Sequence, residues 1–111
     1  ICSALLIPTN QNHYFYADDA NDWYRFTASA SGSARINLSN FQVSKGQLLV
    51  YTGSCSNPTR IGHNGETGVV TTREITLSGL TAGNTYYIWV LSGEGLNSTS
   101  PYNLRVEMAA P

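Results

Sequence analysis

The stretch "LTAGNTYYIWVL", residues 80–91, decides the fold, because it joins a glycine turn to a strand with two different faces. Alternate side chains of an extended strand point to opposite sides. One face carries side chains that suit a core: Tyr86, Ile88 and Val90. The other face carries two large rings and a leucine: Tyr87, Trp89 and Leu91. A solvent-facing surface does not normally present such a row, so this second face is expected to be covered or to bind something.

Leu80 and Tyr86 have the spacing of a tyrosine corner. In that motif the phenol caps a backbone group at the edge of a β-sandwich. The turn between them contains Ala82-Gly83, which are typical turn formers. Tyr86 is therefore expected to be a structural residue.

Alternation of polar and apolar residues continues along the chain, and no segment keeps the spacing of an amphipathic helix. It occurs in "HYFYA", "WYRFTA", "ARINLS", "LLVYTG", "REITLSGL" and "YNLRVEM", with a short further piece at Arg60 to Gly62. Turn formers such as Ser31-Gly32 and Asn57-Pro58 separate these segments. About eight short strands in this pattern predict an all-β fold, an antiparallel two-sheet β-sandwich.

Length and charge limit the possible functions. The 111 residues are enough for a single domain, with residues 1–13 as an N-terminal arm and residues 108–111 as the start of a linker or tail. The net charge is -1, and the six lysines and arginines are scattered singly. This pattern argues against nucleic acid and anionic lipid as partners. No apolar run is long enough for membrane insertion.

Cys2 and Cys55 are the two cysteines of the chain. Two are too few for a zinc cage, and they do not form a redox CxxC motif. The residues favour a disulfide that ties the arm to the body over two buried thiols. A loop of this length would contribute about 3 to 4 kcal/mol in the chain-entropy model. A disulfide would also place the protein in an oxidising, secreted or extracellular setting.

Four segments in order carry a resemblance to a known family. They are "DWYRF" at residues 22–26, "YTGSC" at residues 51–55, "GLTAGNTYYI" at residues 79–88 and "YNLRV" at residues 102–106. Between roughly residues 17 and 108 the chain resembles the bacterial pre-peptidase C-terminal domain family, whose relatives include the collagen-binding domains of clostridial collagenases. "SGLTAGNTYY" is also similar to fibronectin type III domains, although the hydroxyl-rich first half and "YTGSCS" favour the first family.

The resemblance implies a small jelly-roll-like sandwich attached to secreted hydrolases or cell-surface proteins. Such domains are usually noncatalytic, and several members bind polysaccharides, chitin or collagen. The residues agree with a noncatalytic role, because His13 and His63 lie in no nucleophile or metal motif. No two carboxylates are marked as the acid and base of glycoside hydrolysis. We therefore expect no enzyme activity in this domain and no required cofactor.

The segment "ADDAND", residues 17–22, suggests a calcium site. Asp18, Asp19 and Asp22 offer the hard oxygen ligands that Ca²⁺ prefers, although the EF-hand pattern is missing. The family resemblance adds to this hypothesis, since clostridial relatives bind calcium through an acidic N-terminal segment. The alternative is a polar turn whose aspartates cap backbone amides.

The outward aromatic residues are the candidate ligand site. Sugar rings stack on indole and phenol rings, so a platform needs two or three roughly coplanar aromatics with polar neighbours. The candidates are Trp23 with Arg25, Tyr87 with Trp89, and Tyr51, followed by Tyr14 or Tyr16. The alternative is that the arm "ICSALLIP" covers this face, because Leu5, Leu6 and Ile7 need burial.

Two functional hypotheses follow. In the first, the domain attaches a secreted enzyme or surface protein to a polysaccharide, a fibrous protein or another insoluble polymer. In the second, it is a structural repeat or subunit of a surface adhesin or extracellular filament. Its apolar patch would then meet a neighbouring domain, another copy or a donated strand.

Overall fold

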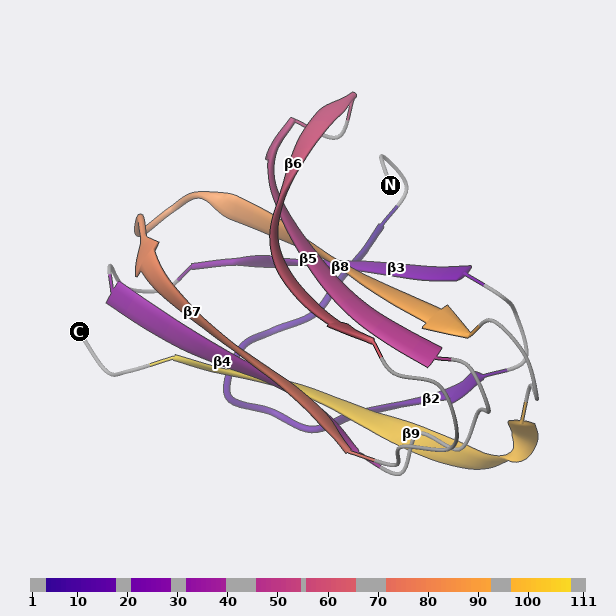
Figure 1. Ribbon diagram of the computed structural model, residues 1–111. Coiled ribbons are helices and arrows are strands. Elements are labelled where there is room, and N and C mark those ends of the chain that lie inside the picture. Colours follow the sequence, from indigo (N-terminus) through magenta and orange to yellow (C-terminus); the bar gives the residue numbers. More distant parts are fainter. Residues whose placement is uncertain are drawn as a thin grey trace.

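The computed structural model describes residues 4–17, 21–28, 32–39, 46–54, 56–65, 72–92 and 97–108. These residues form nine β-strands in two sheets that pack face to face (Figure 1). The strands are β1 Leu5–Leu6, β2 His13–Ala17, β3 Asn21–Thr27, β4 Gly32–Ser39, β5 Gly46–Ser54, β6 Asn57–Gly65, β7 Arg73–Leu80, β8 Thr85–Ser92 and β9 Asn97–Met108. The predicted all-β sandwich is confirmed. Over the same residues there is no helix that could cross a membrane.

The strand order is that of a jelly roll. One sheet has the order β1-β3-β8-β5-β6 and the other has the order β2-β9-β4-β7. Antiparallel pairs are nested along the chain, since β2 pairs with β9, β3 with β8, β4 with β7, and β5 with β6. This nesting is how eight strands form the two sheets of a jelly roll. The ninth strand, beyond the predicted eight, is β1, which comes from the N-terminal arm.

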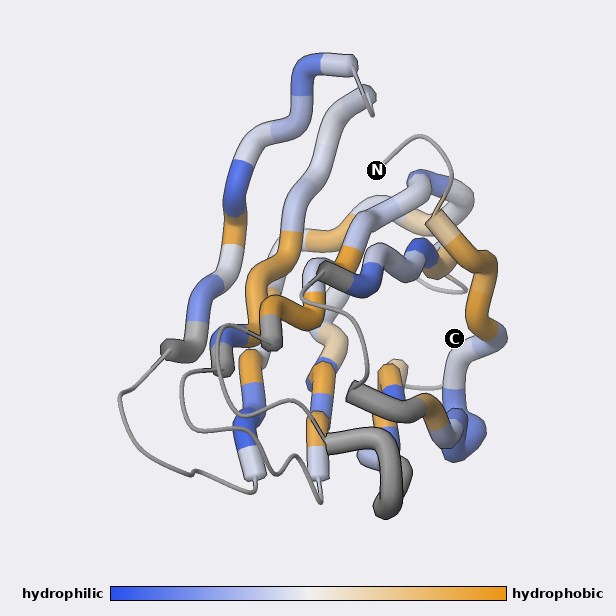
Figure 2. The backbone as a smooth tube through the Cα atoms, turned by 90° about the vertical axis from the view of Figure 1, so that its right-hand side faces the viewer, coloured by the Kyte–Doolittle hydropathy of each residue, from blue (hydrophilic) through white to orange (hydrophobic). Residues whose placement is uncertain are grey.

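The core lies between the sheets and is built from alternate residues of each strand. Fully buried side chains come from both sheets: Phe26, Ile36, Leu38, Leu48, Val50, Ile88, Val90, Leu104 and Val106. Figure 2 shows the corresponding alternation of hydrophobic and hydrophilic residues along the strands. The sandwich is therefore stabilised mainly by apolar burial between its layers.

The tyrosine corner predicted from the sequence is present. Tyr86 is buried, and its phenol oxygen accepts a hydrogen bond of 3.0 Å from the backbone N–H of Thr81. Leu80 is buried in the same core. Gly83 has a φ of 87°, a left-handed conformation that glycine adopts without strain. The turn and the phenol together fix where β8 begins.

Strand β1 of the arm lies at the edge of the five-stranded sheet. β1 pairs in parallel with β3, with Leu5 opposite Tyr24 and Leu6 opposite Arg25. Ile7 reaches the core, whereas the side chains of Leu5 and Leu6 are 53% and 50% exposed. The expectation that all three would be buried is wrong, because β1 extends the sheet sideways and only Ile7 passes between the layers.

Several predicted features lie outside the described residues. They are Cys2, Cys55, Asp18, Asp19 and the tail beyond Met108. The disulfide and the calcium ligands therefore stay predictions.

Candidate functional site

The register of the five-stranded sheet brings the predicted outward aromatics onto one face. Directly paired residues of neighbouring strands project to the same side of a sheet. One row across the sheet consists of Trp23, Trp89, Leu49 and His63. The next row consists of Leu6, Arg25, Tyr87, Tyr51 and Arg60. We call the outer surface formed by Trp23, Leu49, Tyr51, Tyr87 and Trp89 the aromatic face.

Three rings of the aromatic face form a cluster. The ring centroids of Trp23 and Trp89 lie 5.0 Å apart with an interplanar angle of 10°, which is a stacked arrangement. The ring of Tyr51 lies 5.6 Å from that of Trp23 and 6.5 Å from that of Trp89. Because β3 and β5 are separated by β8, their backbones lie about 10 Å apart. The rings of Trp23 and Tyr51 therefore meet over β8, which lies between their strands.

This geometry differs from the platform expected from the sequence. The two indoles are stacked on each other instead of lying side by side in one plane. Trp23, Tyr51 and Trp89 are half-buried and not fully exposed, and so is Tyr87. A stacked indole uses one of its faces on its neighbour. Trp23 and Trp89 thus form one stacked pair and do not offer two separate rings to a ligand.

Leu49 supports this cluster, and sequence reasoning did not assign it to the site. It faces away from the core but is only 4% exposed, and it lies directly opposite Trp89. The run "LLVY" at residues 48–51 carried the signal, because four large side chains in succession predict a strand that is apolar on both faces. Burial of Leu49 shows that the outer aromatics cover apolar surface of their own sheet.

Positive and polar side chains border the aromatic face. Arg25 is half-buried, and its Nε donates a hydrogen bond of 3.1 Å to the carbonyl oxygen of Ala4. His63 is exposed, and its Nε2 lies 2.8 Å from Oε1 of Gln47. Sequence reasoning named Arg25 but placed His63 in a turn, whereas the structure places it in β6. The face therefore combines rings with groups that can form hydrogen bonds.

Arg60 also borders this face, and a β-bulge is the reason. β6 has one unpaired residue, Ile61, between the pairs Tyr51–Arg60 and Val50–Gly62. Without the bulge, simple alternation would place Arg60 on the core side together with Gly62. An inserted residue reverses the alternation and re-aims the side chain. Arg60 is exposed on the same side of the sheet as Tyr51.

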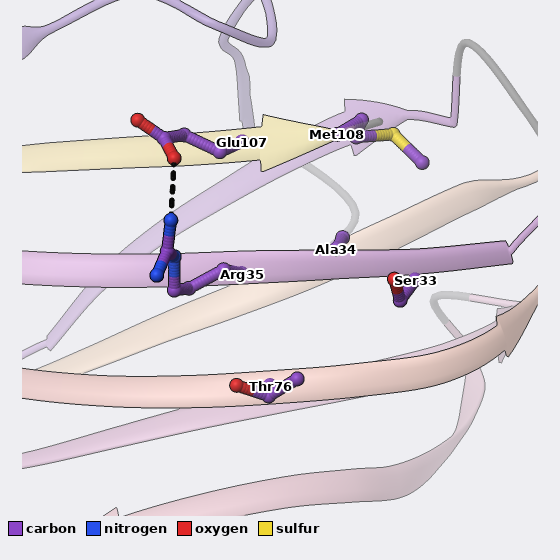
Figure 3. A pocket seen from close by; sticks show the side chains of 6 residues that line it. All are labelled: Ser33, Ala34, Arg35, Thr76, Glu107 and Met108. Atoms are coloured by element: carbon purple, nitrogen blue, oxygen red, sulfur yellow. Dashed lines mark hydrogen bonds and ion pairs between the residues drawn. The ribbon is translucent and has the colours of Figure 1, made fainter. Parts of the chain in front are cut away.

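The outer face of the four-stranded sheet has a different character. A hollow of about 380 Å³ lies there, lined by Ser33, Ala34, Arg35, Thr76, Glu107 and Met108 (Figure 3). Nη2 of Arg35 lies 3.0 Å from Oε2 of Glu107, and Nε of Arg105 lies 2.8 Å from Oε1 of the same residue. Hydrogen bonds from Arg35 and Arg105 lower the pKa of Glu107 below its ordinary value. Because Arg35 and Arg105 are both paired with Glu107, we do not expect this hollow to attract a charged ligand strongly.

Other candidate residues lie away from the aromatic face. Tyr14 is 62% exposed and pairs with Asn103 of the four-stranded sheet, so it is remote from the ring cluster. Asp22 projects inward, and its Oδ2 lies 3.4 Å from the phenol oxygen of Tyr102. Among the residues described, no three acidic, histidine or cysteine side chains form a metal site. For Tyr16 only the backbone is described.

Comparison with known proteins supports the fold. The sequence matches no protein-family model and no curated protein. The structure is similar to the crystal structure of the pre-peptidase C-terminal domain of collagenase from Bacillus anthracis, with a TM-score of 0.67, 18% sequence identity and 94% of each chain covered. It is also similar to PliG, a periplasmic lysozyme inhibitor of g-type lysozyme from Aeromonas hydrophila, with a TM-score of 0.50, 16% identity, and 93% of this chain and 95% of that chain covered.

These similarities confirm the fold that the family resemblance implied. The strand order is that of a jelly roll. The similarity to fibronectin type III domains is therefore confined to the local sequence around the turn before β8. Identities this low carry information on the fold and not on the ligand.

Proposed function

We propose that the chain is a noncatalytic extracellular module that attaches a larger secreted or surface protein to a polysaccharide. The observation that supports this proposal is the cluster of Trp23, Trp89 and Tyr51 on the outer face of the five-stranded sheet. The fold is shared with a domain of a collagenase and with a periplasmic inhibitor, which supports a role outside the cytoplasm.

The proposed contact is between the indole of Trp23 and the C–H face of a sugar ring. One side of the indole stacks on Trp89, and the sugar would stack on the other side. Aromatic faces and the apolar faces of pyranoses attract each other through burial and C–H contacts. The phenol of Tyr87 and the amide of Gln47 lie on the same side of the sheet and would orient sugar hydroxyls.

Retention on insoluble polysaccharides tests this function. The domain is mixed with a panel of insoluble polymers, both neutral ones such as cellulose and chitin and cross-linked acidic polysaccharides, and the unbound fraction is measured. Trp23→Ala and Trp89→Ala are expected to abolish retention. Tyr14→Ala removes an exposed ring from the opposite face and is expected to bind normally. Thermal melts show whether each variant is folded.

The outcomes separate clearly. Normal retention of Trp23→Ala, or absence of retention for the parent domain on every polymer, contradicts the proposed function. If Trp23→Ala unfolds, Trp23→Phe is used in its place. It keeps a ring over Trp89 but offers less area, so it should fold and retain the polymer more weakly.

The alternative function is that of a structural repeat or subunit. It is favoured by the open edge of the five-stranded sheet, where Leu5 and Leu6 of β1 are both about half exposed. Edge strands with apolar side chains are templates for addition of a further strand. In this case the partner would be another copy of the chain or a strand from a neighbouring domain.

A further inference from the structure

The arginines on the two outer faces differ in how they are paired. On the four-stranded sheet, Arg35 and Arg105 share the carboxylate of Glu107. On the five-stranded sheet, no ion pair joins Arg25 or Arg60 to a carboxylate in the part of the chain that the structure describes. Among the described residues, positive charge is therefore compensated on the face of the four-stranded sheet and not on that of the five-stranded sheet.

The described carboxylates all lie elsewhere. Asp22 projects between the sheets toward Tyr102. Glu74 lies on the outer face of the four-stranded sheet, where it accepts a hydrogen bond of 3.2 Å from Asn37. Glu107 belongs to the same face. Within the described residues, the aromatic face thus carries positive but no negative side chains.

Arg25 and Arg60 bracket the aromatic face. They lie in one row, with Tyr87 and Tyr51 between them. The row crosses from β3 to β6, so the two backbones are about 14 Å apart. Trp23 lies beside Arg25 on the same strand and reaches toward Tyr51. A bound chain that follows this row would meet one guanidinium, then the rings, then the second guanidinium.

We propose that the ligand of the aromatic face is an acidic polysaccharide whose uronate carboxylates bind Arg25 and Arg60 while a sugar ring stacks on Trp23. This inference rests on the proposed function and narrows it to one class of polymer. A guanidinium binds a carboxylate through two parallel hydrogen bonds, which fixes orientation as well as adding attraction. Within the described residues, the hydrogen bond to Ala4 uses only Nε of Arg25, so its two terminal nitrogens could make such a contact.

A neutral polysaccharide would use the rings but leave both arginines without a charged partner. A nucleic acid fits the face poorly, because the chain has a net charge of -1 and only scattered cations. Uronic acids supply the apolar ring face and the carboxylate in one repeating unit. That combination matches a row in which one guanidinium group lies on each side of the rings.

Polygalacturonate and its fully methyl-esterified form test the inference, because they share one backbone and differ in charge. Binding is measured by affinity electrophoresis and calorimetry in the presence of a chelator, which prevents calcium gels. Alginate and hyaluronan extend the acidic panel. The parent domain is expected to bind at least one acidic polymer, and the methyl-esterified form about tenfold or more weakly.

Arginine variants test whether Arg25 and Arg60 bind the carboxylates. Arg25→Gln and Arg60→Gln are each expected to weaken binding of the acidic polymer about fivefold to tenfold. Arg35→Gln, which removes the same charge from the opposite face, is expected to bind as the parent does. Trp23→Ala should also lose binding, because the rings and the charges act on one ligand.

Four results would overturn the inference. The first is that the domain binds the charged and the methyl-esterified polymer equally well. The second is that it binds no acidic polymer but does bind a neutral one. Both results leave the proposed function intact. The third is binding that Trp23→Ala does not change and that moderate salt abolishes, which indicates charge attraction without a site. The fourth is equally tight binding of poly-glutamate, which assigns the face to acidic proteins.

Discussion

The phenols of Tyr24 and Tyr102 meet between the two sheets. Tyr24 comes from β3 and Tyr102 from β9, and their hydroxyl groups are hydrogen-bonded to each other. Phe15 packs against both rings, with centroid distances of 4.7 Å and 6.1 Å. Tyr102 is only 1% exposed. Burial first, and then the neighbouring Tyr24 and Asp22, raise the pKa of Tyr102 well above its ordinary value.

This raised pKa predicts a loss of stability in alkali. Above pH 10 or so the unfolded chain ionises Tyr102 while the folded chain does not, so the free energy of unfolding falls as the pH rises. In Tyr102→Phe we expect a shallower fall between about pH 9 and pH 11. At neutral pH the variant should lose about 1 to 2 kcal/mol, because Tyr24 loses a hydrogen-bond partner.

Urea unfolding at several pH values measures both effects. Tyr14→Phe removes an exposed hydroxyl group and serves as the control. Its free energy of unfolding is expected to depend on pH as that of the parent does. Parallel curves for Tyr102→Phe and the parent would show that burial of Tyr102 does not govern alkaline stability.

Individual residue roles could be predicted where they depend on local spacing. The separation of Leu80 and Tyr86 was sufficient to predict the tyrosine corner, because the motif lies within one turn and one strand. The stacking of Trp23 on Trp89 was not predictable in the same way. It depends on the register between β3 and β8, which no local pattern in the sequence determines.

Gly62 is the position at which strand β6 packs across β7. A Cβ atom at Gly62 would lie 2.8 Å from Cγ2 of Ile75 and 3.2 Å from Cδ2 of Leu77. Cγ2 of Ile75 sits on a branched carbon and cannot swing away as the end of a flexible side chain can. Glycine is therefore required for this close approach between the two sheets.

The variant Gly62→Ala is expected to lower the free energy of unfolding by about 1 to 3 kcal/mol, as overpacking of a filled core usually does. Chemical denaturation measures the change. Thr59→Ala alters an exposed residue of the same strand and should cost about 0.5 kcal/mol or less. A Gly62→Ala variant as stable as the parent would mean that β6 can shift away from β7 at no cost.

Strand boundaries were predicted best where one face of the strand is buried. β4 from Ala34 onward and β7 as far as Leu77 alternate between buried and more exposed residues, and the sequence pattern shows it. β6 extends over residues 57–65, well beyond the short piece expected at Arg60 to Gly62, because most of its described side chains are exposed and leave no alternating pattern. β1 was missed because two residues are too few for any periodicity.

Across the whole molecule, the two outer faces differ in the side chains they present. The four-stranded sheet presents a polar network in which arginines and Glu107 satisfy one another. The five-stranded sheet presents rings and two arginines, Arg25 and Arg60, that no carboxylate of the described residues pairs. The sequence was sufficient to predict the all-β sandwich, because polar and apolar residues alternate in most of its strands. It could not show that Arg60 joins the aromatic face, because that depends on a single bulge at Ile61.

The proposed binding function predicts that the domain stays a monomer. β1 has two residues, so the free edge beside it offers few backbone groups for a further strand. In small-angle scattering the radius of gyration should not change with concentration, and should exceed the 13.2 Å of the Cα trace only by the side chains and hydration. A mass that rises with concentration favours the structural-repeat alternative. If the copies associate through the open edge, Leu6→Lys places a charge there and should restore the monomer. If they associate through the aromatic face, Trp23→Ala should restore the monomer instead.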